Sequence, residues 1–430
     1  MVELFSAAAL QLAQEERWKH PSQFWSGASR ALLPAQGKPS AALMLDALAH
    51  NVRDLLQRST KPVRIASKSI RSREIMRQML ALGDSDLSGI ASRYAGVLGF
   101  SLGEAIWLVE SDPEVFSDVL VAYPSVDREA ISRISQNEIL AKSITLMVDS
   151  IAQLDIVLAA QSGEHQIRVC IDMDMSYRSK LLGHIGVKRS ALHTPAEVRA
   201  FAENIVRRPD LRLVGLMGYE AQIAGVANNP AGMGFFQGLE TRMVSKIQEA
   251  SKSELRQRRA EAVSLIREIA EIEFVNGGGT GSIESTVADD SVTEVAAGSG
   301  LFGSHLFDHY QSFNPAPAAA FALPVVRKPE QDIATLFGGG WVASGPAGES
   351  RLPLIASPES LKFLAREGAG EVQSPVQGAA ANGLNEGDWV WMRHTKAGEL
   401  SEHCNTFAVI LGETLVGEVL SYRGEGKVFV

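Results

Sequence analysis

The sequence predicts an α/β protein in which a (β/α)8 barrel of the TIM type is followed by a β-rich domain. Three observations lead to this prediction. From about residue 40 to residue 305, short apolar runs alternate with longer amphipathic stretches, which is the pattern of repeated βα units. Several of these runs end in polar or charged residues. After residue 305 the runs become shorter, and turns rich in Gly and Pro separate them.

Eight apolar runs in the first region are candidate strands, which is the number that a closed (β/α)8 barrel needs. The expected strands are 42–46, 63–67, 96–101, 119–123, 144–149, 167–172, 213–218 and 273–276. The expected helices between them include 48–58, 72–82, 102–110, 195–207 and 235–272. All strands of such a barrel end at the same face, so the residues that follow them are expected to meet there.

Three units are expected along the chain. Residues 1–38 are expected to form a helical segment that packs on the C-terminal domain or on a partner chain. Residues 39–305 are expected to form the barrel. The stretch 314–320, which is rich in Pro and Ala, leads into a β-rich domain at 306–430 that we expect to complete the active site.

Composition and charge narrow the class of protein. The 430 residues are 45% hydrophobic and carry a formal net charge of −9, which gives no electrostatic reason to expect nucleic acid or an anionic membrane as a partner. Cys170 and Cys404 are too few and too far apart for a disulfide framework or a thiolate zinc knuckle. We find no signal peptide and no run of about 18 apolar residues. These features favour a cytoplasmic enzyme with a small-molecule substrate.

Lys68 directly follows the run 63–67, in the segment Val-Arg-Ile-Ala-Ser-Lys-Ser. A lysine at the end of a barrel strand presents an amine at the face where ligands bind, and partial desolvation makes that amine a nucleophile toward an aldehyde. The alternative is a surface lysine that closes a strand. Acidic and amide residues follow other strands in the same way, namely Glu104, Asp149, Asp172, Asp174, Glu220 and Gln222.

A glycine-rich segment, Asn-Gly-Gly-Gly-Thr-Gly-Ser at 276–282, follows the last expected strand. Glycines let the backbone approach a ligand closely, and successive N–H groups with the hydroxyls of Thr280 and Ser282 suit a phosphate dianion. Barrels of this type commonly hold phosphate after the last strands, although glycine also serves plain turns. Together with Lys68, this segment predicts pyridoxal phosphate linked to the lysine.

The order and spacing of these motifs resemble the fold-type III pyridoxal phosphate enzymes, which have an alanine-racemase-like barrel. Within this group the chain looks like the branch of D-threonine aldolase and D-serine dehydratase, which includes proteins described as amino acid deaminase/aldolase. The resemblance covers nearly the whole chain. Besides Lys68 and 276–282, the segments that carry it are 99–105, 177–178, 186–189, 367–373 and 387–390.

The resemblance implies roles for individual residues. Lys68 would form the Schiff base with the cofactor and would be catalytic together with His394. The residues implied to bind the cofactor are Lys68, Tyr177, Arg178, Arg189, Gly278, Gly279, Thr280, Ser282, Asp308 and Tyr310. The glycine-rich loop would hold the phosphate, and Tyr177, Arg178 and Arg189 would lie near the ring and its phenolic oxygen. Ordinary loop polarity is the alternative for these three residues.

The chain departs from its relatives at the metal site. Relatives in this branch hold a divalent cation such as Mn, Mg or Zn through a His-x-Asp or His-x-Cys pair in the C-terminal domain. Here His394 follows the expected strand 389–392, but position 396 is Lys, whose ammonium only donates. His403 and Cys404 are adjacent, so on a strand they face opposite sides. His394, His403 and Cys404 are the candidate ligands, and the sequence leaves the presence of a metal open.

The expected function is that of a pyridoxal-phosphate-dependent lyase for D-configured β-hydroxy amino acids. It would either cleave the Cα–Cβ bond, as D-threonine aldolase does, or remove the hydroxyl and then ammonia, as D-serine dehydratase does. The alternatives are an amino-acid racemase of the same fold and a non-catalytic protein of pyridoxal phosphate homeostasis. The resemblance also implies a homodimer with shared active sites. The sequence does not identify the amino acid, its stereochemistry or the outcome of the reaction.

Overall fold

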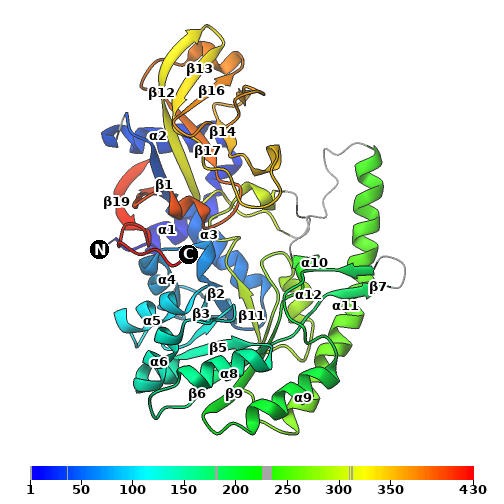
Figure 1. Cartoon of the computed structure of the whole chain (residues 1–430). Coiled ribbons are helices and arrows are strands. Elements are labelled where there is room, and N and C mark those ends of the chain that lie inside the picture. Colours follow the sequence, from blue (N-terminus) through cyan, green and yellow to red (C-terminus); the bar gives the residue numbers. More distant parts are fainter. Residues whose placement is uncertain (1, 36, 180–182, 225–234, 309, 311–312) are drawn as a thin grey trace.

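The computed structural model describes residues 2–35, 37–179, 183–224, 235–308, 310 and 313–430. Two sheets organise the chain (Figure 1): a closed barrel, and a nine-stranded sheet that lies against one end of the barrel. This arrangement confirms the predicted fold class, a TIM-type barrel with a β-rich second domain.

Eight parallel strands close the barrel. They are β2 (Val63–Ala66), β3 (Tyr94–Gly99), β4 (Val119–Val121), β5 (Ile144–Val148), β6 (Ile167–Asp172), β9 (Leu211–Gly218), β10 (Phe274–Gly277) and β11 (Glu294–Ala297). Around the barrel they follow the order β10-β11-β2-β3-β4-β5-β6-β9. The strands are short and mostly buried, because helices cover one side of each and the barrel core covers the other.

The second sheet collects strands from both ends of the chain. They are β1 (Ser40–Met44), β12 (Ala319–Glu330), β13 (Ile333–Phe337), β14 (Leu354–Ser357), β15 (Lys362–Phe363), β16 (Gln373–Gln377), β17 (Trp389–Arg393), β18 (Thr406–Leu411) and β19 (Thr414–Leu420). Seven of them follow the order β15-β16-β13-β12-β1-β18-β19, and β17 pairs with β12 and β14. Phe321, Trp391 and Phe407 are among the largest enclosed side chains.

One predicted barrel strand is wrong. The run at 42–46 forms part of β1, which pairs with β12 antiparallel and with β18 parallel in the second sheet. The eighth barrel strand is instead β11, which pairs with β10 and β2. Both runs are short, apolar and buried, so only their tertiary pairing distinguishes them. Lys68 therefore follows the first strand of the barrel rather than the second.

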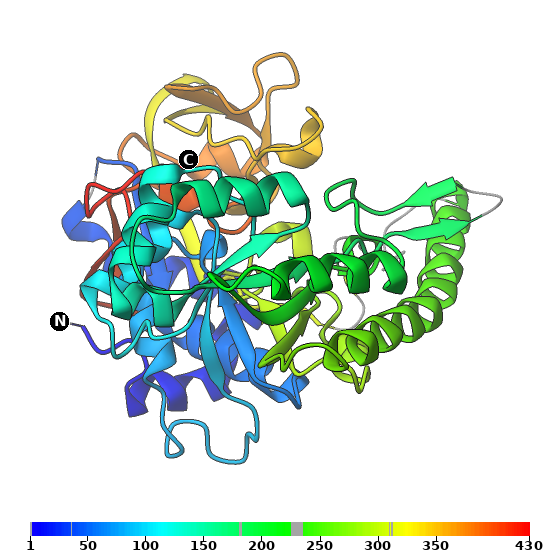
Figure 2. The same cartoon turned by 60° about the horizontal axis from the view of Figure 1, so that its bottom comes forward.

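Helices cover the outside of the barrel between its strands (Figure 1, Figure 2). They are α3 (Leu45–Arg58), α4 (Arg73–Leu80), α5 (Leu102–Ser111), α6 (Arg128–Gln136), α7 (Glu138–Ser143), α8 (Ile151–Ala160), α9 (Pro195–Val206), α10 (Ala221–Ala224), α11 (Phe235–Arg267) and α12 (Ile283–Val287). Ser101, Asp127 and Thr194 each cap the first turn of the helix that follows by accepting a backbone N–H.

The long helix α11 and a small hairpin project from the side of the barrel (Figure 2). The hairpin consists of β7 (Tyr177–Ser179) and β8 (Gly183–Ile185), which pair antiparallel. The base of α11 stays attached to the barrel, because Arg258 donates to the carbonyl oxygen of Ser176 over 2.9 Å.

The N-terminal helices α1 (Ala7–Leu12) and α2 (Pro21–Ala31) pack where the barrel meets the second sheet (Figure 1). The ring centroids of Trp25 and Trp391 are 5.3 Å apart, and the indole N–H of Trp391 donates to Ser29 Oγ over 2.9 Å. Residues near the N-terminus thus contact the second sheet. The domain limits 1–38, 39–305 and 306–430 stay predictions.

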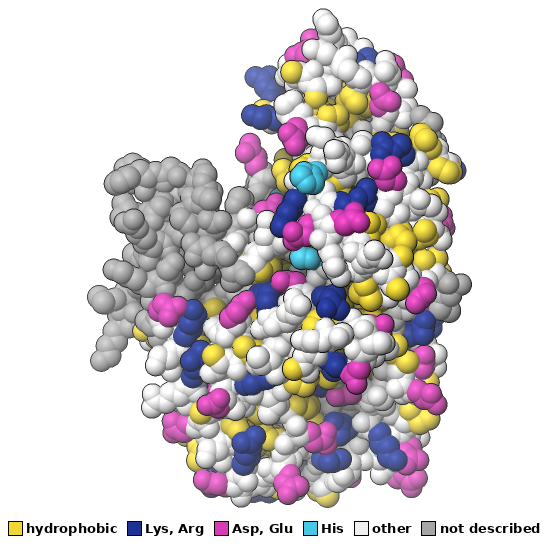
Figure 3. Space-filling model, turned by 180° about the vertical axis from the view of Figure 1, so that it is seen from behind, with side chains coloured by type: hydrophobic (Ala, Val, Ile, Leu, Met, Phe, Trp, Pro, Cys, Tyr) yellow, Lys and Arg dark blue, Asp and Glu magenta, His cyan; other side chains and the backbone are white. Residues whose placement is uncertain are grey.

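The outer surface carries charged side chains of both signs, which are interspersed on the face that Figure 3 shows. In the part of the chain that the structure describes, no helix is both long and apolar enough to cross a membrane.

Candidate active site

A cavity of about 440 Å³ opens where the C-terminal ends of the barrel strands face the second domain. Its volume lies within the range of about 300–1,000 Å³ that is typical of small-molecule sites. The barrel supplies most of the wall, including Lys68, Asp172 and Thr280, and the second domain contributes Lys396 and Glu399. The two domains therefore build one site.

Lys68 lies at the mouth of the barrel in a single 3-10 turn, Ser67–Ser69, that follows β2. The hydroxyl of the buried Ser67 anchors this turn by donating to the carbonyl oxygen of Leu98 in β3 over 3.2 Å. Lys68 lines the cavity, and its Nζ donates to the hydroxyl of Tyr123 over 3.1 Å. With the described residues Lys68 forms no ion pair, so its amine is available to a ligand.

Tyr123 and Arg189 form the polar surroundings of this amine. Burial raises the pKa of the Tyr123 phenol, but the nearby ammonium of Lys68 and the guanidinium of Arg189 outweigh burial and hold the pKa below its usual value. The guanidinium carbon of Arg189 lies 5.8 Å from the ring centre of Tyr123 and 5.7 Å from that of Tyr219. A flat group with a phenolic oxygen would meet a hydroxyl and two cations here.

The second domain holds the turn of Lys68 in place. Gly398 has a φ of +85°, and a Cβ at this position would lie 1.8 Å from the carbonyl oxygen of Lys68, so a side chain does not fit. Arg71 has a φ of +49°, an uncommon value for a residue with a side chain. An ion pair with Glu402 fixes the Arg71 side chain against the second domain.

The glycine-rich loop lines the same cavity through Gly278, Gly279 and Thr280. Gly278 turns the chain with a φ of +78°. Thr280 Oγ1 accepts hydrogen bonds from Ser299 Oγ over 3.0 Å and from the N–H of Gly300 over 3.3 Å. Loops after the last two barrel strands thus bring two hydroxyl groups together, and the Thr280 proton is left to donate to an anion.

A buried ion-pair network stands behind this loop. Arg259 of α11 pairs with Glu220 and with Asp289, and its side chain is only 2% exposed. The second carboxylate oxygen of Glu220 accepts the N–H of Gly278 over 2.8 Å. Removing one partner of a buried pair costs about 3–5 kcal/mol, so the network fixes the point where the loop begins. Glu220 therefore supports the loop from behind.

Asp172, at the end of β6, presents a perturbed carboxyl group to the cavity. Burial and the negative charge of Asp149 raise the pKa of Asp172 to about 7, although Arg189 opposes the shift. Shifts of this kind cluster at functional sites. The carboxyl group exchanges its proton near neutral pH, so it can either donate or accept a hydrogen bond.

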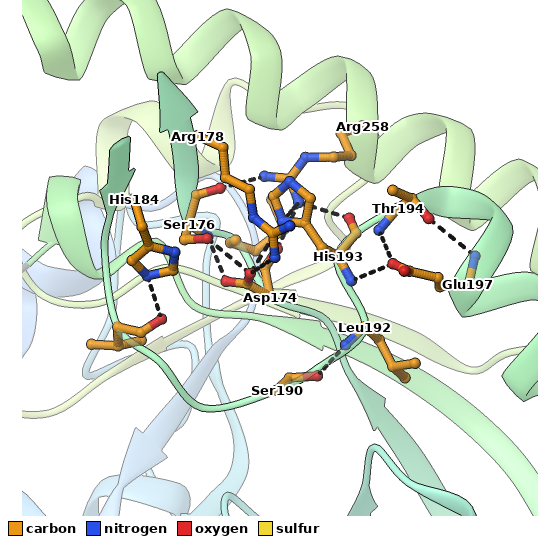
Figure 4. A network of polar contacts seen from close by, with 12 residues as sticks. Asp174, Ser176, Arg178, His184, Ser190, Leu192, His193, Thr194, Glu197 and Arg258 are labelled. Carbon is orange, nitrogen blue, oxygen red and sulfur yellow. Dashed lines mark hydrogen bonds and ion pairs between the residues drawn. The ribbon is translucent and has the colours of Figure 1, made fainter. Parts of the chain in front are cut away.

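Asp174 belongs to the polar network in Figure 4. Its carboxylate accepts hydrogen bonds from the N–H and the hydroxyl of Ser176, both over 2.8 Å, and lies 3.1 Å from His193 Nδ1. Burial raises the pKa of Asp174, but these hydrogen bonds outweigh burial and lower it. Arg258 of α11 donates to the carbonyl oxygen of Asp174 over 2.6 Å. The network fixes both ends of the segment that carries Arg189 to the cavity.

The structure brings six of the predicted cofactor residues to the cavity wall, namely Lys68, Arg189, Gly278, Gly279, Thr280 and Tyr310. Tyr310 closes one side, and its hydroxyl donates to the carbonyl oxygen of Ala224 over 3.1 Å. The aromatic ring of Tyr310 packs against Phe307, with ring centroids 5.1 Å apart.

The other four predicted residues lie outside the lining that the described residues form. Tyr177 and Arg178 belong to β7, and Arg178 pairs with Asp174 over 3.3 Å. Ser282 Oγ accepts the N–H of Gly279 over 3.1 Å and so closes the glycine-rich loop from behind. Asp308 pairs with Arg393 over 2.7 Å. Direct contact of these four with a cofactor stays a prediction.

The three candidate metal ligands do not form one cluster. His394 follows β17 as expected, but its ring is buried and does not line the cavity. Burial, and then the charge of Arg393, lower the pKa of His394 to about 3, so the imidazole is neutral at neutral pH. The exposed His403 stacks on Trp341 with ring centroids 5.1 Å apart. Among the described residues, no group of three or more His, Cys, Asp or Glu side chains is arranged to hold a metal ion, so the set of His394, His403 and Cys404 does not fit one.

Comparison with known proteins identifies the family. Residues 43–305 match the family profile described as alanine racemase, N-terminal domain. The chain belongs to this family. No protein with a curated description matches the sequence.

Solved structures similar to this member of the alanine racemase N-terminal domain family share its fold. D-threonine aldolase from Filomicrobium marinum is 18% identical with a TM-score of 0.68, over 90% of this chain and 95% of that chain. D-threo-3-hydroxyaspartate dehydratase from Delftia sp. HT23 is 16% identical with a TM-score of 0.61, over 89% and 97%. Alanine racemase from Bacillus anthracis is 14% identical with a TM-score of 0.60, over 90% and 98%. At these identities the likeness is one of fold.

Pyridoxal phosphate is the cofactor expected for enzymes of this family, and the cavity residues fit it. The aldehyde needs an amine that no carboxylate neutralises, which Lys68 provides. The phosphate needs a donor on a loop with little side-chain bulk, which the Thr280 hydroxyl provides among the adjacent glycines, and Ser299 orients this hydroxyl by donating to it.

The cavity wall includes residues that the sequence analysis did not single out, among them Tyr123, Ser299 and Ser344. Tyr123 is the last residue of the predicted strand 119–123. It would have been identified if every residue at the end of a predicted strand had been treated as a candidate site residue. Ser299 follows β11, the strand that the sequence analysis missed. Ser344 lies in a loop of the second domain, where no local pattern marks it.

Proposed function

We propose that this chain is a pyridoxal-phosphate-dependent lyase that acts on D-configured β-hydroxy amino acids. It would either break the Cα–Cβ bond or eliminate the β-hydroxyl and release ammonia. The observation that carries the proposal is that the amine of Lys68 and the hydroxyl pair of Thr280 and Ser299 line one cavity at the C-terminal face of the barrel. The preference for D-configured substrates rests on two structures of the same fold, a D-threonine aldolase and a D-threo-3-hydroxyaspartate dehydratase.

Different residues of the cavity would bind different parts of the cofactor. Lys68 would bind its aldehyde, and the Thr280 hydroxyl, oriented by Ser299, would bind its phosphate. Arg189 would lie beside the ring, and Asp172, whose carboxyl group exchanges its proton near neutral pH, would lie within reach of a ring atom. When bound, pyridoxal phosphate accepts the electron pair that remains when a bond at the substrate's Cα breaks.

Lys68 would have a second role, proton transfer, once the substrate amine has replaced it on the cofactor aldehyde. The freed amine stays at the mouth of the barrel, where the Tyr123 hydroxyl lies 3.1 Å from it. It is positioned to take or return a proton at the substrate's Cα, which is work that typically contributes about 10²–10⁴-fold to a rate. The lowered pKa of Tyr123 means that the positive charges of Lys68 and Arg189 stabilise its phenolate form.

A divalent metal is not part of this proposal, because the described candidate ligands do not come together. Because members of the family often form dimers, we infer that this protein is a homodimer with shared active sites. We also infer that it works in the cytoplasm. Light scattering of the purified protein tests the dimer, and a fully active monomer would contradict it.

The proposed activity is tested by incubating the protein with pyridoxal phosphate and a panel of amino acids. D-Threonine, D-serine and D-threo-3-hydroxyaspartate are the substrates, and their L-enantiomers with D- and L-alanine are the controls. Cleavage gives glycine and an aldehyde, elimination gives a keto acid and ammonia, and either product from a D-substrate supports the proposal. Racemisation of alanine without either product overturns it in favour of a racemase.

A further inference from the structure

Two charged residues of the second domain, Lys396 and Glu399, line the cavity. Lys396 lies in the short connection that follows β17, and Glu399 is the first residue of the 3-10 helix that comes next, Glu399–Glu402. Neither residue holds the cofactor in the proposal above. Their charges are opposite, and both reach the same partner in the wall, Ser344.

The backbone on either side of Lys396 is fixed. Thr395 is 1% exposed, and its hydroxyl donates to the carbonyl oxygen of Leu352 over 2.8 Å. Two residues after Lys396, Gly398 packs on the carbonyl oxygen of Lys68. Two residues span at most about 7 Å, so the backbone of Lys396 stays close to the reactive lysine.

Ser344 holds the two charged groups side by side. The ammonium of Lys396 donates to Ser344 Oγ over 2.8 Å and to the Ser344 carbonyl oxygen over 3.4 Å. The carboxylate of Glu399 accepts the N–H of Ser344 at both oxygens, over 3.2 and 3.3 Å. An ammonium has three donors, so one N–H of Lys396 is left for a ligand. Within the described part of the chain Lys396 has no ion pair, and a carboxylate has spare lone pairs.

A donor next to an acceptor matches a hydroxyl group, which both accepts and donates one hydrogen bond. A carboxylate in the place of this hydroxyl would be repelled by Glu399, and an ammonium in its place would be repelled by Lys396. The pair therefore discriminates in favour of a neutral hydroxyl. In a β-hydroxy amino acid, the β-hydroxyl is the group that lies beyond the reacting Cα.

We propose that Lys396 and Glu399 bind the β-hydroxyl of the substrate and direct the reaction to Cα–Cβ cleavage. This inference rests on the function proposed above and names the chemistry of the same site. Glu399 takes the hydroxyl proton, and the O–H electron pair becomes the second bond of an aldehyde carbonyl. The Cα–Cβ bond breaks and leaves its electron pair on Cα, which takes up a proton to give glycine. The free N–H of Lys396 stabilises the negative charge that develops on the oxygen.

The test uses the full-length protein loaded with pyridoxal phosphate. Lys396→Met and Glu399→Gln keep the length of each side chain and remove its charge. Lys328→Met is the matched control, because Lys328 donates to the carbonyl oxygen of Ala381 in the second domain and does not line the cavity. One readout is kcat/KM for D-threonine cleavage. The other is the dissociation constant of D-2-aminobutyrate, which has the shape of threonine without the hydroxyl.

Both cavity variants are expected to lose about 10²-fold or more in kcat/KM, the effect of removing a general base or a charge-stabilising donor. Their affinity for D-2-aminobutyrate should be unchanged, because that ligand has no hydroxyl to bind. Lys396→Arg should recover part of the loss, and Lys328→Met should match the wild type.

Two results would overturn the inference. One is cleavage by either cavity variant at the wild-type rate, and the other is an equal loss of affinity for D-2-aminobutyrate, which indicates a merely structural role. Keto acid and ammonia as the products of the wild type would overturn the cleavage step while leaving the proposed lyase intact. A wild type that transforms no β-hydroxy amino acid would remove the proposed function itself.

Discussion

The two walls of the cavity are built in different ways. The barrel wall places its groups directly after strands, as Lys68 follows β2 and Thr280 follows β10, so the closed sheet fixes their relative positions. The second-domain wall places Ser344, Lys396 and Glu399 on loops that are far apart in sequence. The barrel wall carries the groups that suit the cofactor of the family, whereas the loop wall carries the charged pair that we propose binds the substrate hydroxyl.

The walls also differ in their support. Behind the barrel wall lie buried ion pairs, such as that of Arg64 with Glu294 over 2.7 Å and that of Arg259 with Asp289 over 2.7 Å. The backbone of the loop wall is fixed at Thr395 and Gly398, but its charged side chains are held by hydrogen bonds to Ser344, which is exposed. A rigid wall suits a permanently held cofactor, and a wall of exposed loops can vary its chemistry without loss of the fold.

The largest loss of activity is expected from a substitution in the barrel wall, at Lys68. Lys68→Ala removes both the covalent link and the base, so activity should fall by about 10⁴-fold or more. Lys61→Ala is the control, since Lys61 precedes β2 at the opposite end of the strand and bonds to the carbonyl oxygen of Asp289. Steady-state kinetics with D-threonine measure both variants, and comparable losses in the two would contradict the assignment.

A smaller effect is expected where the two walls touch. Gly398→Ala places a Cβ 1.8 Å from the carbonyl oxygen of Lys68 and must shift the lysine turn. Misplacement of a reacting group by about 1 Å can cost about 10²-fold, and we expect a loss of this order in kcat/KM. A Cβ at Gly383, also in the second domain, meets no atom within 4 Å, so Gly383→Ala should leave the rate unchanged. Equal rates for the two variants would show that the walls are independent.

Weakening the phosphate contacts should act on affinity rather than rate. Thr280→Val removes the hydroxyl that we assign to the phosphate, and Ser299→Ala removes the hydroxyl that orients it. A hydrogen bond to a charged group contributes about 1.5–3 kcal/mol. The dissociation constant of pyridoxal phosphate should therefore rise by about 10-fold or more. Ser285→Ala serves as the control, because Ser285 bonds to the carbonyl oxygen of Ser282 and does not line the cavity. Unchanged affinity in both test variants would place the phosphate elsewhere.

The smallest effect on activity is expected at Glu104, which joins the barrel to the C-terminal segment. Its carboxyl group accepts from the Tyr422 hydroxyl over 2.7 Å and from the N–H of Phe100 over 2.6 Å. Burial raises the pKa of Glu104 from 4.5 to about 7. The folded state therefore holds this proton more tightly than the unfolded state does, so the stabilisation is full below pH 4.5 and is lost as the pH rises through about 7.

Glu104→Gln should flatten this fall in stability, which amounts to about 3 kcal/mol at roughly 1.36 kcal/mol for each unit of pKa. Urea unfolding on both sides of this pH window measures the effect. A variant whose free energy of unfolding falls as steeply as that of the wild type would rule out Glu104 as its source.

The sequence predicts the barrel wall better than the loop wall for physical reasons. Lys68 and the loop 276–282 follow local apolar runs, and a parallel barrel brings all such ends to one face. The strand at 42–46 was assigned to the wrong sheet because a short buried run carries no information about its partner. Lys396 was noticed only as a poor metal ligand, since its contact with Ser344 joins residues 52 positions apart. Contacts of this length depend on the tertiary fold.

The central claim, that the barrel wall binds pyridoxal phosphate through Lys68, has a direct test. The wild-type protein is mixed with pyridoxal phosphate, reduced with borohydride and digested, and the labelled peptide is identified by mass spectrometry. We expect a visible absorbance band that borohydride removes and a pyridoxyl group on the peptide that contains Lys68. A label on a different lysine, or no label on the folded protein, would contradict it.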